Sequence, residues 1–162
     1  VDKVPEAVLM WLDRQFKEGK LRYQSEKGEL WDNPKDVLKK KEADCDGYGV
    51  LEYFIIRKIF IDMGVWKNVK HRLKCVAGNI NDVGLIPSNK GAHFYLIWLH
   101  SDGEWYGIET TYFRERSFLN YSRKPIKRDP IYGTIWFTFN EQYSWAQNSI
   151  SVSRLDLLKR VN

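Results

Sequence analysis

A cysteine between two aspartates, at the expected start of a helix, is the feature of this sequence that most directly suggests chemistry. Asp44, Cys45 and Asp46 precede a long apolar helical pattern. The first N–H groups of a helix lack partners and its macrodipole is positive there, so both favour the thiolate, the nucleophilic form of cysteine. The aspartates oppose a negative charge on sulfur. We therefore expect a cationic partner, a histidine, to hold the thiolate.

Catalysis by a cysteine needs a base within hydrogen-bond reach and a third group that orients the base. The chain has three histidines. His71 and His100 lie in polar surroundings that are typical of the surface, whereas His93 opens the most apolar strand pattern, residues 94–99. A histidine at the mouth of a buried strand is partly desolvated and still reachable. His93 is therefore the candidate base, with a purely structural histidine as the open alternative.

Helices that come early in the chain are expected to position these residues. Apolar residues at helical spacing predict a helix over residues 5–18, ended by Gly19. An asparagine followed by proline predicts a short helix over residues 34–41. The main helix is expected over residues 45–63, with Gly64 as its C-terminal cap. Its predicted apolar stripe consists of Val50, Leu51, Phe54, Ile55 and Ile59.

Strand patterns follow the helices. Strands are expected over residues 73–77, 93–99, 105–109 and 131–139, and a closing helix over residues 153–161. The last strand alternates, with one predicted side made of Ile131, Gly133, Ile135, Phe137 and Phe139 and the other of Tyr132, Thr134, Trp136 and Thr138. Helices first and antiparallel strands later indicate an α+β fold, in which the central helix carrying the cysteine packs on the sheet.

Composition predicts one domain over residues 1–162, with its core at about residues 20–140. The longest apolar run, 94–99, is too short to span a membrane and no segment resembles a signal peptide, which predicts a cytoplasmic protein without a membrane partner. Cys45 and Cys75 alone do not make a disulfide framework. The basic stretch 114–128 could attract nucleic acid, but a solvated basic loop is the plainer interpretation, so no nucleic-acid partner is expected.

An ordered set of motifs resembles the core of the transglutaminase-like superfamily, and most closely its bacterial cysteine peptidase branch. The motifs are Tyr23 and the segments 31–34, 44–48, 93–96 and 105–111, and together they cover roughly residues 20–112. The resemblance implies a papain-like α+β core and a site made of Cys45, His93 and Glu109. Glu109 stands where the family usually has aspartate, Thr110 replaces a proline, and Gly47 and Gly49 replace bulkier residues, which would widen the site.

The resemblance implies an enzyme: a cysteine peptidase or amidase, or a transglutaminase-like acyltransferase, acting on a protein or peptide. His93 would hold Cys45 as a thiolate–imidazolium pair, and Glu109 would fix the imidazole tautomer. The thiolate would attack a peptide or carboxamide carbonyl and form a thioacyl-enzyme, which water or an amine resolves. The Cys45 N–H and, as a guess, Gln24 would bind the oxyanion. No cofactor is predicted.

Other interpretations stay open at this point. A catalytically silent binding module could have the same fold. Calcium could bind at Asp44 and Asp46, because some peptidases of this branch use calcium. A metal site made of Cys45, His71, Cys75 and His93 lacks the closed spacing of a tetrahedral centre.

The hairpin that joins the His93 strand to the Glu109 strand tests whether these two residues can meet. A symmetric two-residue turn at Asp102 and Gly103 would place Tyr112 opposite His93 and Glu109 on the other face of the sheet. His93 and Glu109 can meet only if the loop has an odd number of residues or a bulge shifts the register. We therefore expect one of these two features.

Overall fold

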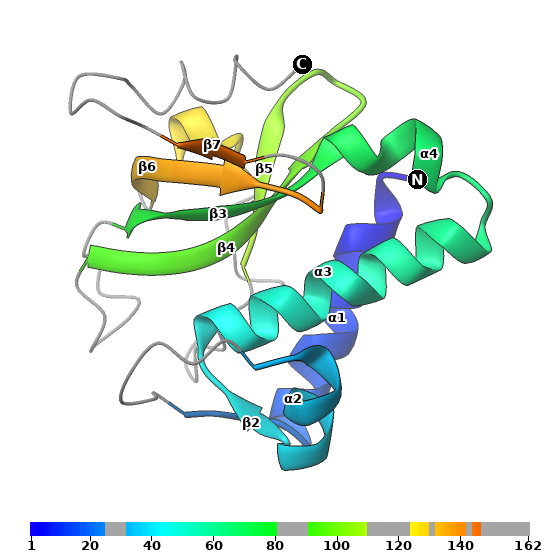
Figure 1. Ribbon diagram of the computed structural model, residues 1–162, viewed down its shortest axis with the longest axis vertical. Coiled ribbons are helices and arrows are strands. Elements are labelled where there is room, and N and C mark those ends of the chain that lie inside the picture. The colour runs from blue at the N-terminus through cyan, green and yellow to red at the C-terminus, as the bar shows by residue number, and fades with distance from the viewer. Residues whose placement is uncertain (25–31, 81–90, 110–123, 130–131, 142–143, 147–162) are drawn as a thin grey trace.

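The computed structural model describes residues 1–24, 32–80, 91–109, 124–129, 132–141 and 144–146 (Figure 1). The helices are α1 (Lys3–Lys17), α2 (Pro34–Lys40), α3 (Cys45–Asp62) and α4 (Trp66–Val69), with short 3-10 turns η1 (Lys70–Arg72) and η3 (Ile126–Arg128). The strands are β1 (Arg22–Tyr23), β2 (Glu42–Ala43), β3 (Leu73–Ile80), β4 (Gly91–Leu99), β5 (Trp105–Ile108), β6 (Tyr132–Phe139) and β7 (Ser144–Ala146). The predicted α+β order of helices and then strands is confirmed.

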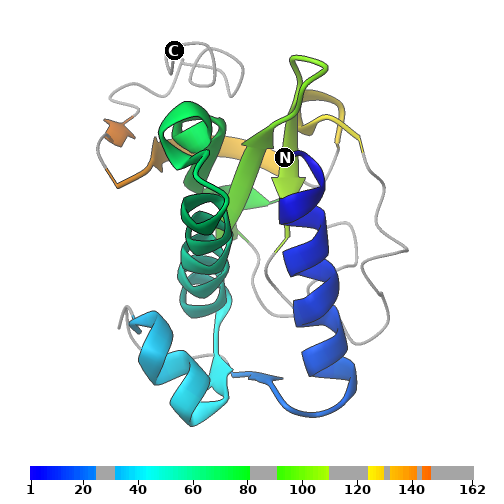
Figure 2. The same ribbon diagram turned by 90° about the vertical axis from the view of Figure 1, so that its right-hand side faces the viewer.

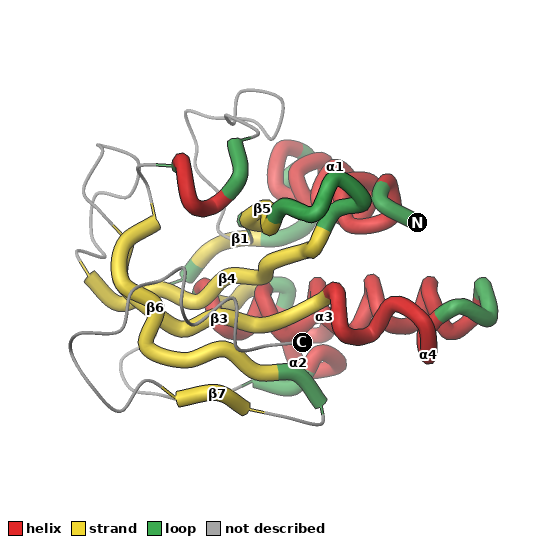
Figure 3. The backbone as a smooth tube through the Cα atoms, turned by 90° about the horizontal axis from the view of Figure 1, so that it is seen from above, coloured by secondary structure: helices red, strands yellow, loops and turns green. Residues whose placement is uncertain are grey.

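An antiparallel sheet of five strands, in the order β5-β4-β3-β6-β7, forms the scaffold (Figure 3). Helices α1 and α3 lie side by side against it (Figure 2). The N-terminal end of α3 and the beginning of β4 lie at the same end of the molecule (Figure 1). This arrangement brings the first residues of a helix close to the first residues of a buried strand. No helix in the described residues is both long and apolar enough to cross a membrane.

The predicted helix ends are confirmed by their capping contacts. The Asn33 side chain caps α2 by accepting a hydrogen bond from the Asp36 N–H at 3.1 Å. Asp44 caps α3, which begins at Cys45 as expected. Gly64 follows α3 with φ of 73°, the left-handed conformation that glycine adopts without a steric penalty.

The predicted apolar stripe of α3 is wrong at Phe54, whereas its other four residues lie in or against the core. Leu51 is buried, but Phe54 is 46% exposed, and Val50, Ile55 and Ile59 are only partly buried. The buried positions of the helix are Gly47, Tyr48, Gly49, Leu51, Glu52, Tyr53, Ile56 and Phe60. Because α3 is apolar on most of its sides, the sequence pattern alone did not determine which side faces the sheet.

Two apolar cores lie on the two faces of the sheet, and a third joins the N-terminal helices. The first, between α3 and the sheet, includes Ile56, Phe60, Leu96 and Trp98. The second contains Val76, Tyr95, Ile97, Ile126, Tyr132 and Ile135. The third packs α1 and α2 against the first turns of α3. Both ends of α3 are therefore fixed by packing, which holds its first residue in place.

The predicted strict alternation of the last strand is also wrong. Tyr132 and Ile135, which were expected on opposite sides, belong to the same buried cluster. The pairing of β3 with β6 shifts register between Ala77 and Gly78 and again between Gly78 and Ile80. A bulge adds a residue and reverses the side on which later side chains lie. Ile131 and the predicted helix over 153–161 lie outside the described residues.

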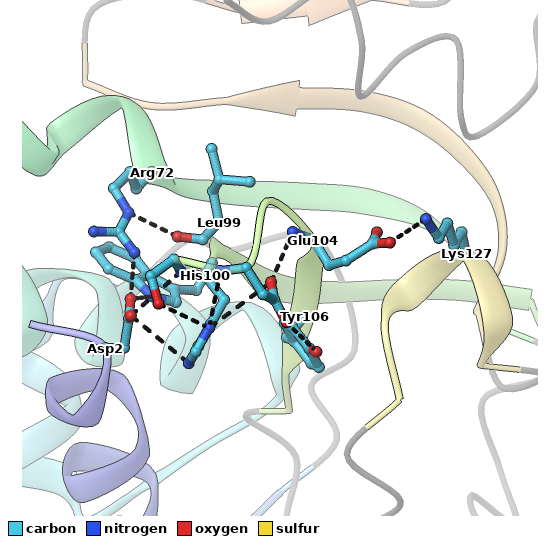
Figure 4. A network of polar contacts seen from close by, with 10 residues as sticks. Asp2, Arg72, Leu99, His100, Glu104, Tyr106 and Lys127 are labelled. Carbon is cyan, nitrogen blue, oxygen red and sulfur yellow. Dashed lines mark hydrogen bonds and ion pairs between the residues drawn. The ribbon is translucent and has the colours of Figure 1, made fainter.

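A polar network fastens the N-terminus to the β4–β5 hairpin (Figure 4). The Asp2 carboxylate accepts hydrogen bonds from Arg72, from Trp98 Nε1 at 2.9 Å and from the Ser101 N–H at 3.3 Å. Burial opposes the charge, but the bonds from Ser101 and Trp98 and the charge of Arg72 outweigh it and lower the pKa of Asp2 to about 2. The network thereby connects α1 to the strand that carries His93.

Candidate active site

Cys45 is the first residue of α3, and contacts on both of its sides fix this position. On one side, β1 and β2 pair in parallel, and the Gln24 N–H donates to the Ala43 carbonyl at 2.9 Å. On the other side, the Tyr48 hydroxyl donates to the Arg22 carbonyl at 2.5 Å. Cys45 is half-buried and is not in a disulfide. The sulfur therefore lies at a rigid helix N-terminus, where the macrodipole favours negative charge.

Gly47 allows the first turn of α3 to pack against β2. A Cβ atom at this position would lie 2.7 Å from Ala43 Cβ, closer than two carbon atoms can approach. The family resemblance implied that glycine here widens the site. The structure corrects this expectation for Gly47, because the space is filled by Ala43 and the glycine brings two backbones together.

His93 lies near the beginning of β4 and is hydrogen-bonded to Glu109. His93 Nε2 is 2.9 Å from Glu109 Oε1 and 3.1 Å from Oε2. The two residues are 4% and 7% exposed, so the contact is almost entirely dry. The His93 ring also stacks on Tyr95, with 5.9 Å between ring centroids. Such contacts hold the imidazole in one orientation.

The hairpin register explains why Glu109 reaches the histidine. Leu99 pairs with Trp105 and Leu96 with Ile108, so the loop over 100–104 has an odd number of residues, as one of the two alternatives predicted. In this register odd-numbered residues face odd-numbered residues. Extended by one position, it places Glu109 opposite Tyr95, on the same face as His93 and diagonal to it. A two-residue turn would have placed Glu109 on the other face.

The electrostatic environment of His93 favours the imidazolium. Burial by itself lowers the pKa of His93, but the Glu109 charge, hydrogen bonding to Cys45 and Glu109, and the Cys45 charge outweigh burial and raise it to about 10. Since Glu109 occupies Nε2, the nitrogen left for Cys45 is Nδ1. This atom is buried and makes no hydrogen bond of full geometry with any described residue. The Cys45 thiol nevertheless interacts with the ring and contributes to the raised pKa of His93.

The sequence analysis missed one buried acid, Glu52, in the middle of α3. Its side chain is 0% exposed, and neither carboxyl oxygen has a hydrogen-bond partner among the described residues. Burial, and secondarily the charge of Glu109, raise the pKa of Glu52 well above its ordinary value. It lies seven positions after Cys45, about two helical turns, so both lie on the same side of the helix. A single acid inside an apolar helical stretch was the signal that could have revealed it.

The remaining candidates lie apart from this site or outside the described residues. Cys75 is 4% exposed, and burial raises the pKa of its thiol far above the ordinary value. Trp98 belongs to the core, where it stacks on Phe60. Most of the basic stretch, 114–123, and Trp31 lie outside the described residues. The Gln24 side chain is exposed, and no contact assigns it to an oxyanion site.

Metal-binding alternatives receive no support from the residues that are described. These residues contain no group of three or more His, Cys, Asp or Glu side chains arranged to hold a metal ion. Asp44 Oδ1 and Asp46 Oδ1 both accept the Gly47 N–H, at 3.4 and 2.7 Å. Both carboxylates thus contact the first turn of α3 through one oxygen each.

Comparison with known proteins identifies the fold. The structure is similar to LapG of Legionella pneumophila in its calcium-bound form, with a TM-score of 0.58, and in its EGTA-treated form, with a TM-score of 0.57. Each is 15% identical to this chain, and the alignments cover 97% of this chain and 80% and 79% of those chains. No protein-family model and no curated protein matches the sequence. At this identity the likeness is one of fold: this chain shares its α+β fold with LapG.

Proposed function

We propose that this protein is a cysteine-dependent enzyme that cleaves or transfers peptide or carboxamide bonds through a thioacyl intermediate. Cys45 would be the nucleophile, His93 the base and Glu109 the group that orients the base. The observation that carries the proposal is the buried His93, which binds Glu109 through Nε2 at 2.9 and 3.1 Å and interacts with Cys45. These three groups, in this order, are what a papain-like site requires.

The first half of the reaction forms the thioacyl-enzyme. The Cys45 thiolate attacks the carbonyl carbon, and the Cys45 N–H at the start of α3 stabilises the oxyanion. The C–N bond then breaks, and His93 Nδ1 gives its proton to the leaving amine or ammonia. Glu109 holds Nε2–H throughout, so the lost proton is the one that faces Cys45.

The second half regenerates the enzyme. Neutral His93 Nδ1 takes a proton from water while the water oxygen bonds to the acyl carbon. The C–S bond breaks, Cys45 leaves as the thiolate, and the carboxylic acid is released. An amine in place of water gives a new amide by the same proton transfers. The thiolate–imidazolium pair is then restored.

LapG is described as calcium-bound, but no step proposed for this chain passes through calcium. The EGTA-treated structure matches almost as well. A protein or peptide substrate is proposed because the sequence motifs resemble the cysteine peptidase branch and the structure shares its fold with LapG.

Two substrates separate hydrolysis from transfer. Peptide-bond cleavage is measured with casein, and carboxamide chemistry with benzyloxycarbonyl-Gln-Gly, by ammonia release in water and by hydroxamate formation with hydroxylamine. We expect activity that disappears in Cys45→Ala and persists in Cys75→Ala, with no dependence on added calcium or EGTA. Folding of both variants is checked by circular dichroism.

The same measurements distinguish an enzyme from a catalytically silent binding module. Absence of turnover on both substrates, together with equal slow alkylation of both cysteines, would contradict an enzyme. Full activity in Cys45→Ala would show that the chemistry resides elsewhere in the chain.

A further inference from the structure

The sheet face that carries His93 also carries a row of aromatic rings. The His93 ring stacks on Tyr95, with 5.9 Å between ring centroids and 21° between the ring planes. Tyr95 in turn packs on Tyr132, with 4.5 Å between centroids and 35° between planes. All three side chains are buried. Three rings therefore follow one another inside the protein, and the first of them is the proposed base.

Tyr132 reaches this row because one residue of β5 has no side chain. Tyr132 belongs to β6 and Gly107 to β5, with β4 and β3 between these two strands (Figure 3). A Cβ atom at Gly107 would lie 2.4 Å from the Tyr132 hydroxyl oxygen, and 2.6 and 2.8 Å from the ring atoms Cζ and Cε2. Atoms cannot approach so closely, so any side chain at this position would displace the ring. Glycine inside a strand is typical of such a close approach.

The Tyr132 ring lies beside the His93–Glu109 contact. In β4, His93 comes two residues before Tyr95, and in β5, Glu109 comes two residues after Gly107. Residues two apart in a strand lie on the same face of the sheet. The ring that packs on Tyr95 and occupies the space above Gly107 is therefore next to the buried contact on that face.

The orientation of a base depends on packing as well as on its hydrogen bond. The bond to Glu109 fixes one nitrogen of His93, but the imidazole can still turn unless another group lies against its face. Tyr95 lies there, and Tyr132 keeps Tyr95 in place. A displacement of reacting groups by about 1 Å can lower a rate by about a hundredfold. Water beside the contact would also weaken it, because hydrogen bonds are stronger in a dry site.

We propose, on the basis of the function proposed above, that Tyr132 is a positioning residue of the active site. Through Tyr95 it holds the plane of the His93 ring, and it keeps water away from the bond between His93 and Glu109. Gly107 contributes by leaving the space that the Tyr132 ring occupies. The aromatic ring is the part that acts, so phenylalanine can replace tyrosine at this position.

The first test measures kcat/KM for ammonia release from benzyloxycarbonyl-Gln-Gly. Tyr132→Leu keeps an apolar side chain but removes the ring, and we expect kcat/KM to fall by about tenfold. Tyr132→Phe keeps the ring and should stay within about twofold of the wild type. Gly107→Ala displaces the ring and should lose as much as Tyr132→Leu. The double variant Gly107→Ala/Tyr132→Leu should lose no more than either single variant, because no ring is left to displace.

Ile126→Val is the control for a purely structural role. Ile126 is buried in the same apolar core as Tyr95 and Tyr132, and this substitution weakens the core while all three rings remain. We expect it to lower the melting temperature and to leave kcat/KM unchanged, with all variants compared at a temperature at which circular dichroism shows them folded. Additive losses in the double variant, equal losses in Tyr132→Phe and Tyr132→Leu, or an equal loss in Ile126→Val would overturn the proposal.

A measurement without turnover separates this proposal from the proposed function. In a Cys45→Ala background, the His93 Nε2–H proton that is bonded to Glu109 is followed by NMR of protein labelled with 15N-histidine. Its rate of exchange with water reports how well the bond is shielded. His71 is exposed and the His100 side chain is 41% exposed, so their ring protons exchange rapidly and do not interfere.

The exchange rates have a definite expected order. The His93 proton should exchange about tenfold faster in Tyr132→Leu and Gly107→Ala than in Tyr132→Phe and Ile126→Val. This order in a protein that hydrolyses neither substrate would support the role of Tyr132 at His93 and count only against the proposed function. Equal exchange in all four variants would contradict the role of Tyr132, even in an active enzyme.

Discussion

At the residue scale, the site is held together by one buried acid–base contact. Glu109 binds His93 through both carboxylate oxygens, and this contact with the Cys45 interaction raises the pKa of His93 to about 10 despite burial. A ring that is protonated at neutral pH is the cationic partner that a thiolate between two aspartates needs. His93 and Glu109 therefore form a dry contact, and the half-buried Cys45 interacts with the His93 ring.

The two cysteines offer an internal comparison of thiol reactivity. Cys45 is half-buried beside an imidazolium, whereas burial raises the pKa of Cys75 far above its ordinary value. At pH 6 we expect iodoacetamide to modify Cys45 at least about tenfold faster than Cys75, because the thiolate is the reacting species. Peptide mapping by mass spectrometry measures both rates in one sample. Equal rates would contradict activation of Cys45.

The orienting role of Glu109 is tested by two substitutions. Glu109→Gln keeps the size of the side chain but removes the charge that favours the required tautomer, so turnover should fall by about 10²–10⁴-fold. Glu109→Asp should retain more activity, because a carboxylate is still present. Wild-type activity in Glu109→Gln would leave Asp129, which is also buried, as the next candidate.

The same substitution predicts a change in pH-dependent stability. The folded-state pKa of His93, about 10, lies above the unfolded value, so its stabilisation is complete below about pH 6.5 and is lost as the pH rises through 10. The wild type should therefore exceed Glu109→Gln in urea-unfolding free energy at pH 6, and the difference should narrow by pH 10. A constant difference would mean that Glu109 stabilises the fold by contacts other than the His93 charge.

At the element scale, the start of α3 is positioned by close backbone packing against β2. In Gly47→Ala the added methyl group would collide with Ala43, and we expect a loss of about 1–3 kcal/mol of stability. Alkylation of Cys45 should slow as well, because the first turn of α3 must move. The double variant with Ala43→Gly removes the opposing methyl group and should restore both properties. Failure of this rescue would place the strain elsewhere.

The N-terminal network of Asp2 attaches α1 to the hairpin that carries the site. Its lowered pKa, about 2, means that the stabilisation is complete above the unfolded value near 4 and is lost as the pH falls through 2. Asp2→Asn should reduce stability at pH 7 by about 1–2 kcal/mol, and the difference should disappear towards pH 2. Urea unfolding curves of the wild type and Asp2→Asn at several pH values measure this difference in stability. A difference that persists at pH 2 would show that the charge is not responsible.

At the scale of the whole molecule, the order of helices and strands was predictable from the sequence. Which side of a helix or strand is buried was not. Caps such as Asn33 and Gly64 act locally, so the helix ends followed from the sequence. The buried side of α3 depends on contacts with the sheet, and for that reason Phe54 was expected inside and Glu52 was not considered. Glu109 entered through the family resemblance, and only the odd loop of the hairpin showed how it shares a face with His93.

The overall likeness to LapG concerns the fold, and a fold supports different activities. Any claim of catalysis therefore depends on the chemistry of Cys45. Intact-mass and peptide-mapping spectrometry after rapid quenching of the protein with p-nitrophenyl acetate tests this claim most directly. We expect one acetyl group on Cys45 that decays with time in water, none on Cys75, and none at either position in folded Cys45→Ala. An acetyl group absent from Cys45 in the folded wild type, or present there without decay, would contradict a turnover cycle through a thioacyl-enzyme.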